Sequence, residues 1–310
     1  MINKMTAVLF SGQGAQYPGM MEEFYEEYSS VKEIFAVAEK SLGRDIRELC
    51  FRGTQEELNR THNTQVCMLA ADLSAAAALR ENSVNIDVCA GFSLGEYAAL
   101  VYSGMLAPEE AFSLVQIRAD AMQEAVPEGE GAMAAFLKVD AKIVEELCRE
   151  IEEGFVVPSN YNSPAQTVVS GTATGVEAAV RLASERGILT SVLPVSAPFH
   201  CELMKPAADV LKKELDRISI SKGNIPVYMN VDGSRLNSEK QLKEKLYLQA
   251  FHPVLWEQSL NRMYADGVRV FIECGPGKAL TGMTKKTLKG VTACRVEDRK
   301  TLENTLKQMR

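Results

Sequence analysis

A serine lies at the centre of the segment Gly91-Phe92-Ser93-Leu94-Gly95, between a short apolar run over residues 86–90 and a helical pattern that begins at Leu94. The apolar run has the length of a buried strand. A sharp strand-to-helix turn suits a nucleophile, because it projects the serine oxygen from the edge of a sheet. Free N–H groups at the start of the helix can bind an oxyanion. The motif therefore indicates acyl chemistry at Ser93, and a structural glycine-rich turn is the alternative interpretation.

A serine nucleophile needs a general base, and the chain has three histidines. His200 ends the segment Ser196-Ala197-Pro198-Phe199-His200, directly before a predicted helix over residues 202–218, where a histidine is biased towards its neutral form. His62 lies in a polar stretch and is expected on the surface or in a turn. His252 precedes a proline in an extended segment, and we expect its side chain to be structural. Since no Asp or Glu stands in an obvious third position, a backbone carbonyl or an amide is expected to orient the base.

Arg118 is the most informative charged residue, because it continues the apolar face of a helix predicted from Pro108 to about Val126. The apolar members of that face are Ala111, Leu114, Val115 and Met122. An arginine in such a position is unfavourable to bury unless it is paired. Two interpretations remain open: a snorkelling side chain or internal salt bridge, and a bidentate clamp for a substrate carboxylate.

The segment Gly275-Pro276-Gly277-Lys278 follows a strand predicted over residues 268–273 and superficially resembles a phosphate-binding loop. It lacks the spacing of a Walker motif and the Ser or Thr that follows the lysine there. We therefore interpret it as a tight turn.

A sheet with helices around it must position these residues. Strands are predicted at residues 7–10, 86–90, 226–230 and 268–273, the last as the final strand, and helical spacing at residues 35–42, 66–79, 94 onward, 108–126 and 202–218. Strands that alternate with helices predict an α/β fold with a mostly parallel sheet.

The middle of the chain has a different pattern. Predicted elements follow in the order β-α-β-β-α-β, at residues 132–139, 141–152, 155–160, 166–170, 175–186 and 188–195, with a turn at Asn162-Ser163-Pro164 between the two central strands. This order is that of a ferredoxin-like domain. We therefore expect a small domain, residues 131–196, inserted into a parent domain formed by residues 1–130 and 197–310.

Composition limits the kinds of function. The 310 residues are 46% hydrophobic and 24% charged, as in ordinary globular proteins, and the net charge of -7 argues against nucleic acid or an anionic membrane as partner. The seven cysteines are dispersed without metal-ligand spacing, which is typical of reduced thiols in a cytoplasmic protein. No apolar run is long enough to span a bilayer or to form a signal-peptide core.

Six segments together resemble the malonyl-CoA:acyl carrier protein transacylases and the acyltransferase domains of fatty-acid and polyketide synthases. They are residues 10–16 (FSGQGAQ), 91–97 (GFSLGEY), 123–127 (QEAVP), 160–164 (NYNSP), 196–200 (SAPFH) and 275–278 (GPGK). This set, in this order, is highly specific and covers nearly the whole chain. The resemblance implies an α/β-hydrolase-like domain with a ferredoxin-like insertion.

The same resemblance implies roles for individual residues. Ser93 would be the nucleophile and His200 its base, and the main-chain N–H groups of Gln13 and Leu94 would form the oxyanion hole. A main-chain carbonyl within residues 250–253 would orient the base.

Arg118 would hold the malonyl carboxylate, and Asn162 occupies the position of the active-site asparagine of the family. Further candidates for binding or supporting substrate are Phe199, Gln65, Met133 and His252. Two departures stand out: many relatives have His where this chain has Phe92, and often Asn or Gln at the position of His252.

The implied reaction is ping-pong transfer of malonyl from malonyl-CoA to the phosphopantetheine thiol of acyl carrier protein, in fatty-acid or polyketide synthesis. The resemblance implies no metal and no bound cofactor, and we expect a monomer. Lys278, Lys285 and Lys286 are candidates for contact with the acidic carrier protein.

Two other classes of function fit the sequence less well. A serine esterase or thioesterase would keep the order Ser, Asp/Glu, His and would need no buried arginine. In this chain the expected oxyanion segment precedes Ser93 and Arg118 follows it, which favours carboxyacyl transfer. A non-catalytic scaffold that binds the carrier protein is disfavoured by the intact set of Ser93, His200 and Arg118.

Overall fold

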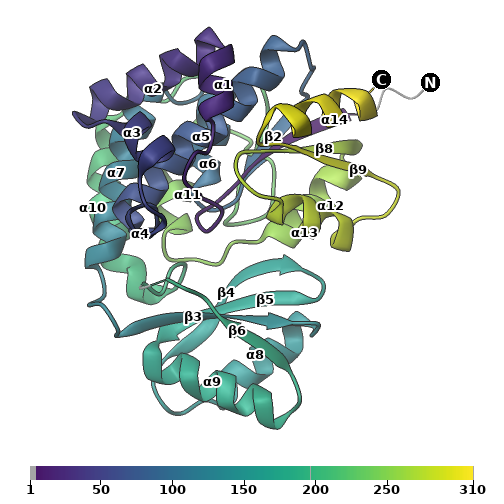
Figure 1. The fold of residues 1–310 in the computed structure, drawn as a ribbon. Helices are drawn as coiled ribbons and strands as arrows, with labels where there is room; N and C mark the ends of the chain where they lie inside the picture. Colours follow the sequence, from purple (N-terminus) through teal and green to yellow (C-terminus); the bar gives the residue numbers. More distant parts are fainter. Residues whose placement is uncertain (1–4, 196, 310) are drawn as a thin grey trace.

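The computed structural model describes residues 5–195 and 197–309, and its larger sheet has five parallel strands in the order β7-β2-β1-β8-β9 (Figure 1). The strands are β1 (Met5–Phe10), β2 (Val88–Gly91), β7 (Val227–Tyr228), β8 (Val268–Cys274) and β9 (Thr292–Val296). The prediction of an α/β fold with a mostly parallel sheet is therefore confirmed. The prediction that residues 268–273 form the final strand was wrong, because β9 follows at the edge of the sheet.

The register of this sheet brings the sequence motifs to one edge. Phe10, the last residue of β1, pairs with Gly91 of β2 on one side and with Cys274 of β8 on the other. In a parallel sheet the loops that follow neighbouring strands leave from the same edge. The loops that begin at Ser11, Phe92 and Gly275 are consequently neighbours.

Helices cover both faces of the sheet (Figure 1). The helical elements of the larger part are α1 (Glu22–Glu27), α2 (Ser29–Leu42), α3 (Ile46–Arg52), α4 (Gln55–Asn59), α5 (Thr61–Glu81), α6 (Gly95–Tyr102), α7 (Pro108–Glu124), η1 (Glu202–Met204), α10 (Lys205–Arg217), η2 (Glu239–Gln241), α11 (Leu242–Gln249), α12 (Trp256–Ala265), α13 (Ala279–Thr287) and α14 (Arg299–Met309). In this larger part, helices were predicted only where α2, α5, α6, α7 and α10 lie. The short helices α1, α3 and α4 and the later helices α11, α12, α13 and α14 were not predicted.

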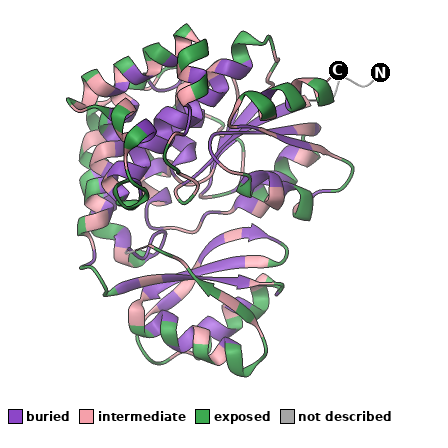
Figure 2. Ribbon diagram, viewed as in Figure 1, coloured by how far each residue is buried: buried purple, intermediate pink, exposed green. Residues whose placement is uncertain are grey.

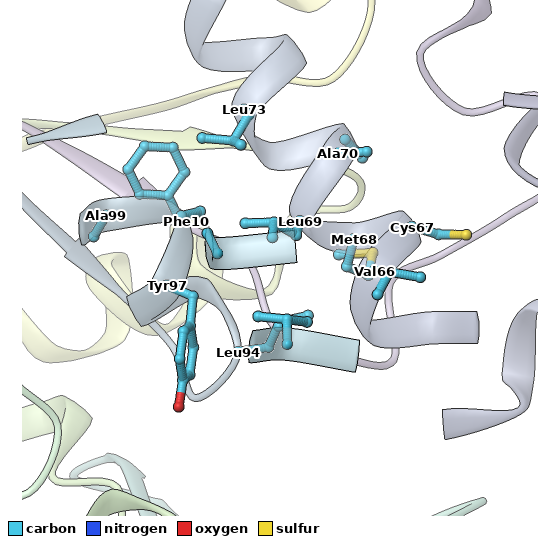
Figure 3. Packing of buried hydrophobic residues seen from close by; sticks show 14 of the residues in the cluster. Phe10, Val66, Cys67, Met68, Leu69, Ala70, Leu73, Leu94, Tyr97 and Ala99 are labelled. Carbon is cyan, nitrogen blue, oxygen red and sulfur yellow. The ribbon is translucent and has the colours of Figure 1, made fainter. Parts of the chain in front are cut away.

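Alternate residues of β1 enter two different cores. Val8 and Phe10 pack with α2, α5 and α7, whereas Ala7 and Leu9 pack with α12 and α13. Successive side chains of a strand point to opposite faces, so a strand covered on both faces is apolar throughout. Helix α5 crosses the centre of the first core and is buried along almost its whole length (Figure 2). Figure 3 shows Phe10 beside Leu69 and Leu73 of this helix.

The second sheet has four antiparallel strands in the order β4-β5-β3-β6. Its elements are β3 (Gly131–Leu137), α8 (Ala141–Glu150), β4 (Val156–Ser163), β5 (Gln166–Thr172), α9 (Ala173–Glu185) and β6 (Leu189–Val192). The elements follow the predicted order. The predicted turn was misplaced, because Asn162 and Ser163 belong to β4. Ser163 pairs with Gln166, so only residues 164 and 165 connect the two strands.

Two other boundaries also differ. The helix predicted from residue 202 opens with the 3-10 turn η1 before α10 begins at Lys205. The strand predicted at residues 226–230 is only two residues long, because Asn230 turns away to accept a hydrogen bond from Ser93 in the loop after β2. Among the described residues, no helix is long and apolar enough to cross a membrane.

Candidate active site

A cavity of about 240 Å³ lies where the carboxyl edge of the parallel sheet meets the antiparallel sheet. Of the predicted site residues, those that line it are Gln13, Gln65, Ser93, Leu94, Arg118, Met133, Asn162, Phe199 and His200. Both sheets contribute, since Met133 and Asn162 lie on β3 and β4. Residues 5–195 and 197–309 contain no group of three or more His, Cys, Asp or Glu side chains that could hold a metal ion.

Ser93 occupies a strained turn between β2 and α6. Its φ of 53° is in the left-handed region, which costs roughly 1–3 kcal/mol for a residue other than glycine. The turn is also crowded, because a Cβ at Gly91 would collide with the backbone of Gly95, and one at Gly95 with the backbone of Phe10. Glycines at these two positions are therefore required for the serine to stand above the sheet edge.

His200 contacts the serine directly. The Oγ of Ser93 lies 2.6 Å from Nε2 of His200, and Nδ1 lies 2.8 Å from the carbonyl oxygen of Gln249. A proton on Nδ1 donates to that carbonyl and leaves the lone pair of Nε2 facing the serine. The orienting carbonyl was predicted within residues 250–253. The 2.8 Å contact is instead to Gln249, the residue directly before that segment, and the backbone of His252, inside the segment, forms a further hydrogen bond with the ring.

The electrostatic setting keeps His200 neutral. Burial, followed by the nearby guanidinium of Arg118, lowers the pKa of His200 to about 3. Hydrogen bonds to the backbone at Gln249 and His252 oppose this shift only in part. A general base must be unprotonated to accept a proton, so this setting suits that role. Ser196, the first residue of the predicted motif around His200, lies outside the described residues.

The loop after β1 packs against the serine turn. A Cβ at Gly12 would come within 2.9 Å of the carbonyl oxygen of Phe92, so the two backbones are in close contact. Ser11 anchors this loop to α5 by donating a hydrogen bond of 2.6 Å to Asp72. Gln13 and Leu94 both line the cavity, and within the described part of the chain neither main-chain N–H has an acceptor.

Arg118 is buried, with 2% of its surface exposed, although no carboxylate of the described residues forms an ion pair with it. Its Nη1 donates to Oε1 of Gln65 at 2.6 Å. Its Nη2 lies 3.2 Å from both Oγ of Ser93 and Oε1 of Gln249. Burial excludes a snorkelling side chain. The buried carboxyl Glu96 attracts the guanidinium electrostatically, but no carboxylate of the described residues lies within salt-bridge distance of it. The guanidinium is thus a buried cation beside the serine, supported by neutral amides.

A model of the acyl transferase domain matches residues 8–304. The chain belongs to the acyl transferase domain family. The malonyl CoA-acyl carrier protein transacylase of Bacillus subtilis is 42% identical over 307 residues, which are 98% of this chain and 97% of that protein. The crystal structure of malonyl CoA-acyl carrier protein transacylase from Clostridium perfringens has a TM-score of 0.95 and 42% identity, and the match covers 99% of this chain and 97% of that one. A malonyl-transacylase solved in complex with a holo type II PKS acyl-carrier protein has a TM-score of 0.95 at 37% identity, with 98% and 100% of the two chains covered.

Within this acyl transferase, two of the supporting residues face the cavity in different ways. Asn162 is buried, and its Oδ1 has no hydrogen-bond partner among the described residues. Phe199 forms an apolar wall directly before the base. His252 does not line the cavity; its ring packs against Phe251, with centroids 4.5 Å apart. Phe92, at the other departure from the family pattern, packs edge-on against Trp256 at 5.5 Å.

Two residues of this acyl transferase site were not predicted. The side chain of Gln249 bonds to Ser93 and Arg118, and that of Asn230 bonds to the serine turn. Both lie far from residue 93 in sequence, and neither belongs to a short motif. The only signal for Asn230 is a polar residue at the end of an apolar segment that forms a strand.

The predicted lysines lie near residues that line the cavity, but they are not part of its lining. Lys278, Lys285 and Lys286 are at the start and end of α13, whereas Leu280 and Met283 of the same helix line the cavity. One face of α13 is thus apolar and turned to the cavity, and its ends carry positive charge.

Proposed function

We propose that the chain transfers a malonyl group from malonyl-CoA to the phosphopantetheine thiol of an acyl carrier protein. The observation that carries this proposal is Arg118, a buried guanidinium 3.2 Å from the candidate nucleophile that forms no ion pair with a carboxylate of the described residues. Charge-assisted bidentate bonds between guanidinium and carboxylate are strong and geometrically specific. An acyl group that ends in a carboxylate would complete this site. The names of the relatives support the same donor and acceptor.

The first half-reaction makes a malonyl-serine ester. Ser93 Oγ attacks the thioester carbonyl while Nε2 of His200 takes the hydroxyl proton. The N–H groups of Gln13 and Leu94 stabilise the negative charge that develops on the carbonyl oxygen. The carbon–sulfur bond then breaks, and coenzyme A leaves with the proton from His200.

The second half-reaction reverses these roles. The thiol of the carrier protein gives its proton to His200 and attacks the ester carbonyl, and Ser93 regains its proton as the serine–acyl bond breaks. Arg118 holds the carboxylate in both halves, and Gln65, Asn162 and Met133 shape the site around the acyl group.

The function can be tested by mass spectrometry after incubation with malonyl-CoA. We expect one malonyl adduct, on Ser93, that is lost when holo acyl carrier protein is added and appears on the carrier. An adduct on Cys89 or Cys201 would contradict the assignment. A serine esterase or thioesterase would instead release free malonate at the same rate with or without the carrier protein.

The proposal also covers the type of each domain, the oligomeric state, the cellular location and the surface that binds the carrier protein. Residues 1–130 and 197–310 would form an α/β-hydrolase-like domain and residues 131–196 a ferredoxin-like insertion. The antiparallel order β4-β5-β3-β6 supports the second description. We also propose a monomer in the cytoplasm that serves fatty-acid or polyketide synthesis and binds the acidic carrier protein near Lys278, Lys285 and Lys286.

Replacing Arg118 by alanine should reduce malonyl transfer far more than acetyl transfer. The lost bonds contribute ~1.5–3 kcal/mol, which is about one to two decades in relative kcat/KM. Acetyl has no carboxylate to leave unpaired, so its transfer should be unchanged or improved. Arg118→Lys should recover little, because lysine has no planar fork. Initial rates with both thioesters measure this, and an equal loss for both, with a lower Tm, would indicate a structural role.

Replacing Phe199 by serine should shift acyl preference towards methylmalonyl-CoA. Phe199 lines the cavity directly before the base, so its ring is expected to limit space at the malonyl α-carbon. One added methyl in an apolar pocket changes relative kcat/KM by ~10-fold or more. The ratio of the two kcat/KM values measures this, with acetyl-CoA as the control for a general loss. An unchanged ratio would show that Phe199 does not contact the α-carbon.

A further inference from the structure

Both peptide groups of Ser93 are held by side-chain amides from distant parts of the chain. Oδ1 of Asn230 accepts the N–H of Ser93 at 2.7 Å, and Nε2 of Gln249 donates to the carbonyl of Ser93 at 2.7 Å. A strained backbone persists only where its surroundings over-determine it. These two bonds oppose relaxation of the left-handed φ of Ser93.

Asn230 contacts the serine turn at three places. In addition to its bond with Ser93, its Nδ2 donates to the carbonyl of Gly91 at 2.7 Å, and its own N–H donates to Glu96 at 2.6 Å. The contacted residues precede the serine, include it and follow it into α6. One residue therefore spans the whole turn from the end of β2 to the first turn of the helix.

The position of Asn230 follows from the register of the sheet. Tyr228, the last residue of β7, pairs with Ala90, so the chain that continues from β7 runs beside the serine turn. Asn230 is fully buried and does not line the cavity. It consequently cannot touch the substrate, and any effect it has on acyl transfer acts through Ser93.

Asparagine fits this place for a chemical reason. The site needs an acceptor for one N–H and a donor for one carbonyl on the same short side chain, and a carboxamide supplies both from two separate atoms, as a protonated carboxyl does. Because Asn230 occupies the N–H of Ser93, that N–H is not available to an oxyanion. The neighbouring N–H of Leu94 has no acceptor among the described residues, so it can serve that purpose.

We propose that Asn230 is a positioning residue for acyl transfer, which fixes the serine turn so that Ser93 Oγ stays within reach of His200 and the Leu94 N–H faces the substrate carbonyl. This inference rests on the proposed function of Ser93 as the nucleophile. The inference goes beyond that function, because it assigns control of the position of the nucleophile to a residue outside the cavity.

The test is the rate of Ser93 acylation by malonyl-CoA in rapid-quench experiments, for the full chain and its variants. Asn230→Ala should acylate Ser93 ~10²-fold more slowly with KM within about threefold of the native value, since misplacement of a reacting group by about 1 Å has an effect of this size. The control is Tyr228→Phe, two residues before Asn230. This variant loses the 2.7 Å hydrogen bond from the Tyr228 hydroxyl to Asp266 but leaves the serine turn untouched. Its acylation rate should be unchanged.

For Asn230→Asp, the pH dependence of the acylation rate distinguishes a positioning role from a purely structural one. An ionised aspartate at this position accepts from Ser93 but repels the carbonyl of Gly91, whereas the protonated carboxyl both accepts and donates, as asparagine does. The acylation rate of Asn230→Asp should therefore rise towards the native rate as pH falls, while the native rate stays flat.

Three results would overturn the inference. The first is a native acylation rate in folded Asn230→Ala. The second is a variant in which rate, substrate affinity and Tm all fall together, with no recovery of the rate of Asn230→Asp at low pH. The third is failure of both variants to fold. Each differs from failure of the proposed function, in which the native chain itself forms no adduct on Ser93.

Discussion

Replacing Ser93 by alanine should reduce malonyl transfer by a factor on the order of 10⁶, the loss found when a serine hydrolase loses its nucleophile. Without Oγ no acyl-enzyme can form, and only direct transfer between the two thiols remains. Alanine, like serine, is strained at a φ of 53°, so the turn keeps its geometry. The variant should consequently fold as the native chain does.

Binding separates this result from a general loss of structure. Arg118 and Asn162 remain in Ser93→Ala, so the Kd for malonyl-CoA should stay close to the native value when measured by calorimetry. Steady-state transfer to holo carrier protein gives the rate. Transfer retained within about tenfold of native would contradict a covalent intermediate on Ser93.

Replacing His200 by alanine should slow acylation of Ser93 by ~10²–10⁴-fold, the range typical of a positioned proton acceptor. The 2.6 Å contact from Nε2 to Oγ is the only one between Ser93 and a histidine in the described residues. His252→Ala is the matched control, because its ring packs outside the cavity. A damaging His252→Ala beside a mild His200→Ala would mean that the base had been misassigned.

The pH dependence of the native enzyme gives a second test of this base. Burial and Arg118 lower the pKa of His200 to about 3, so the ring is neutral throughout the ordinary pH range. Between about pH 8 and about pH 5 the titration of His200 should add no limb to the acylation rate near 6.5, where an exposed histidine would give one. Arg118→Ala removes the second cause of the lowered pKa of His200 and should raise the pH below which acylation slows.

His200 also affects the stability of the fold. The unfolded chain protonates His200 near pH 6.5, so this residue lowers fold stability as pH falls below that value.

The candidate site could be predicted from the sequence where short motifs carry it. Ser93, His200 and Arg118 were found because a turn motif, a helix start and a break in an apolar face are local signals. Asn230 and the side chain of Gln249 were missed, because their roles depend on contacts across more than a hundred residues. The predicted segment 250–253 contains one of the two backbone partners of His200, that of His252, but not the carbonyl of Gln249, whose place depends on where α11 ends.

In the fold, too, the elements with a local sequence signal were predicted and those that depend on long-range contacts were missed. Buried strands β1, β2 and β8 were predicted, because a strand covered on both faces is a continuous apolar run. The edge strand β9 was missed: Thr292 and Arg295 interrupt its short run, and only pairing with β8 holds it extended. The two-residue strand β7 was predicted too long, because Asn230 resembles a strand end in sequence but bonds to the serine turn.

All seven cysteines are buried, and this has a consequence for an enzyme whose substrates end in thiols. Burial raises the pKa of Cys89, Cys201 and Cys274, and exchange with a disulfide requires an accessible thiolate. Cys201 is adjacent to His200, yet its Sγ donates to the carbonyl of Pro198 and only 2% of the residue is exposed. Oxidised coenzyme A should therefore form no mixed disulfide with the folded chain, and turnover should not depend on added reductant.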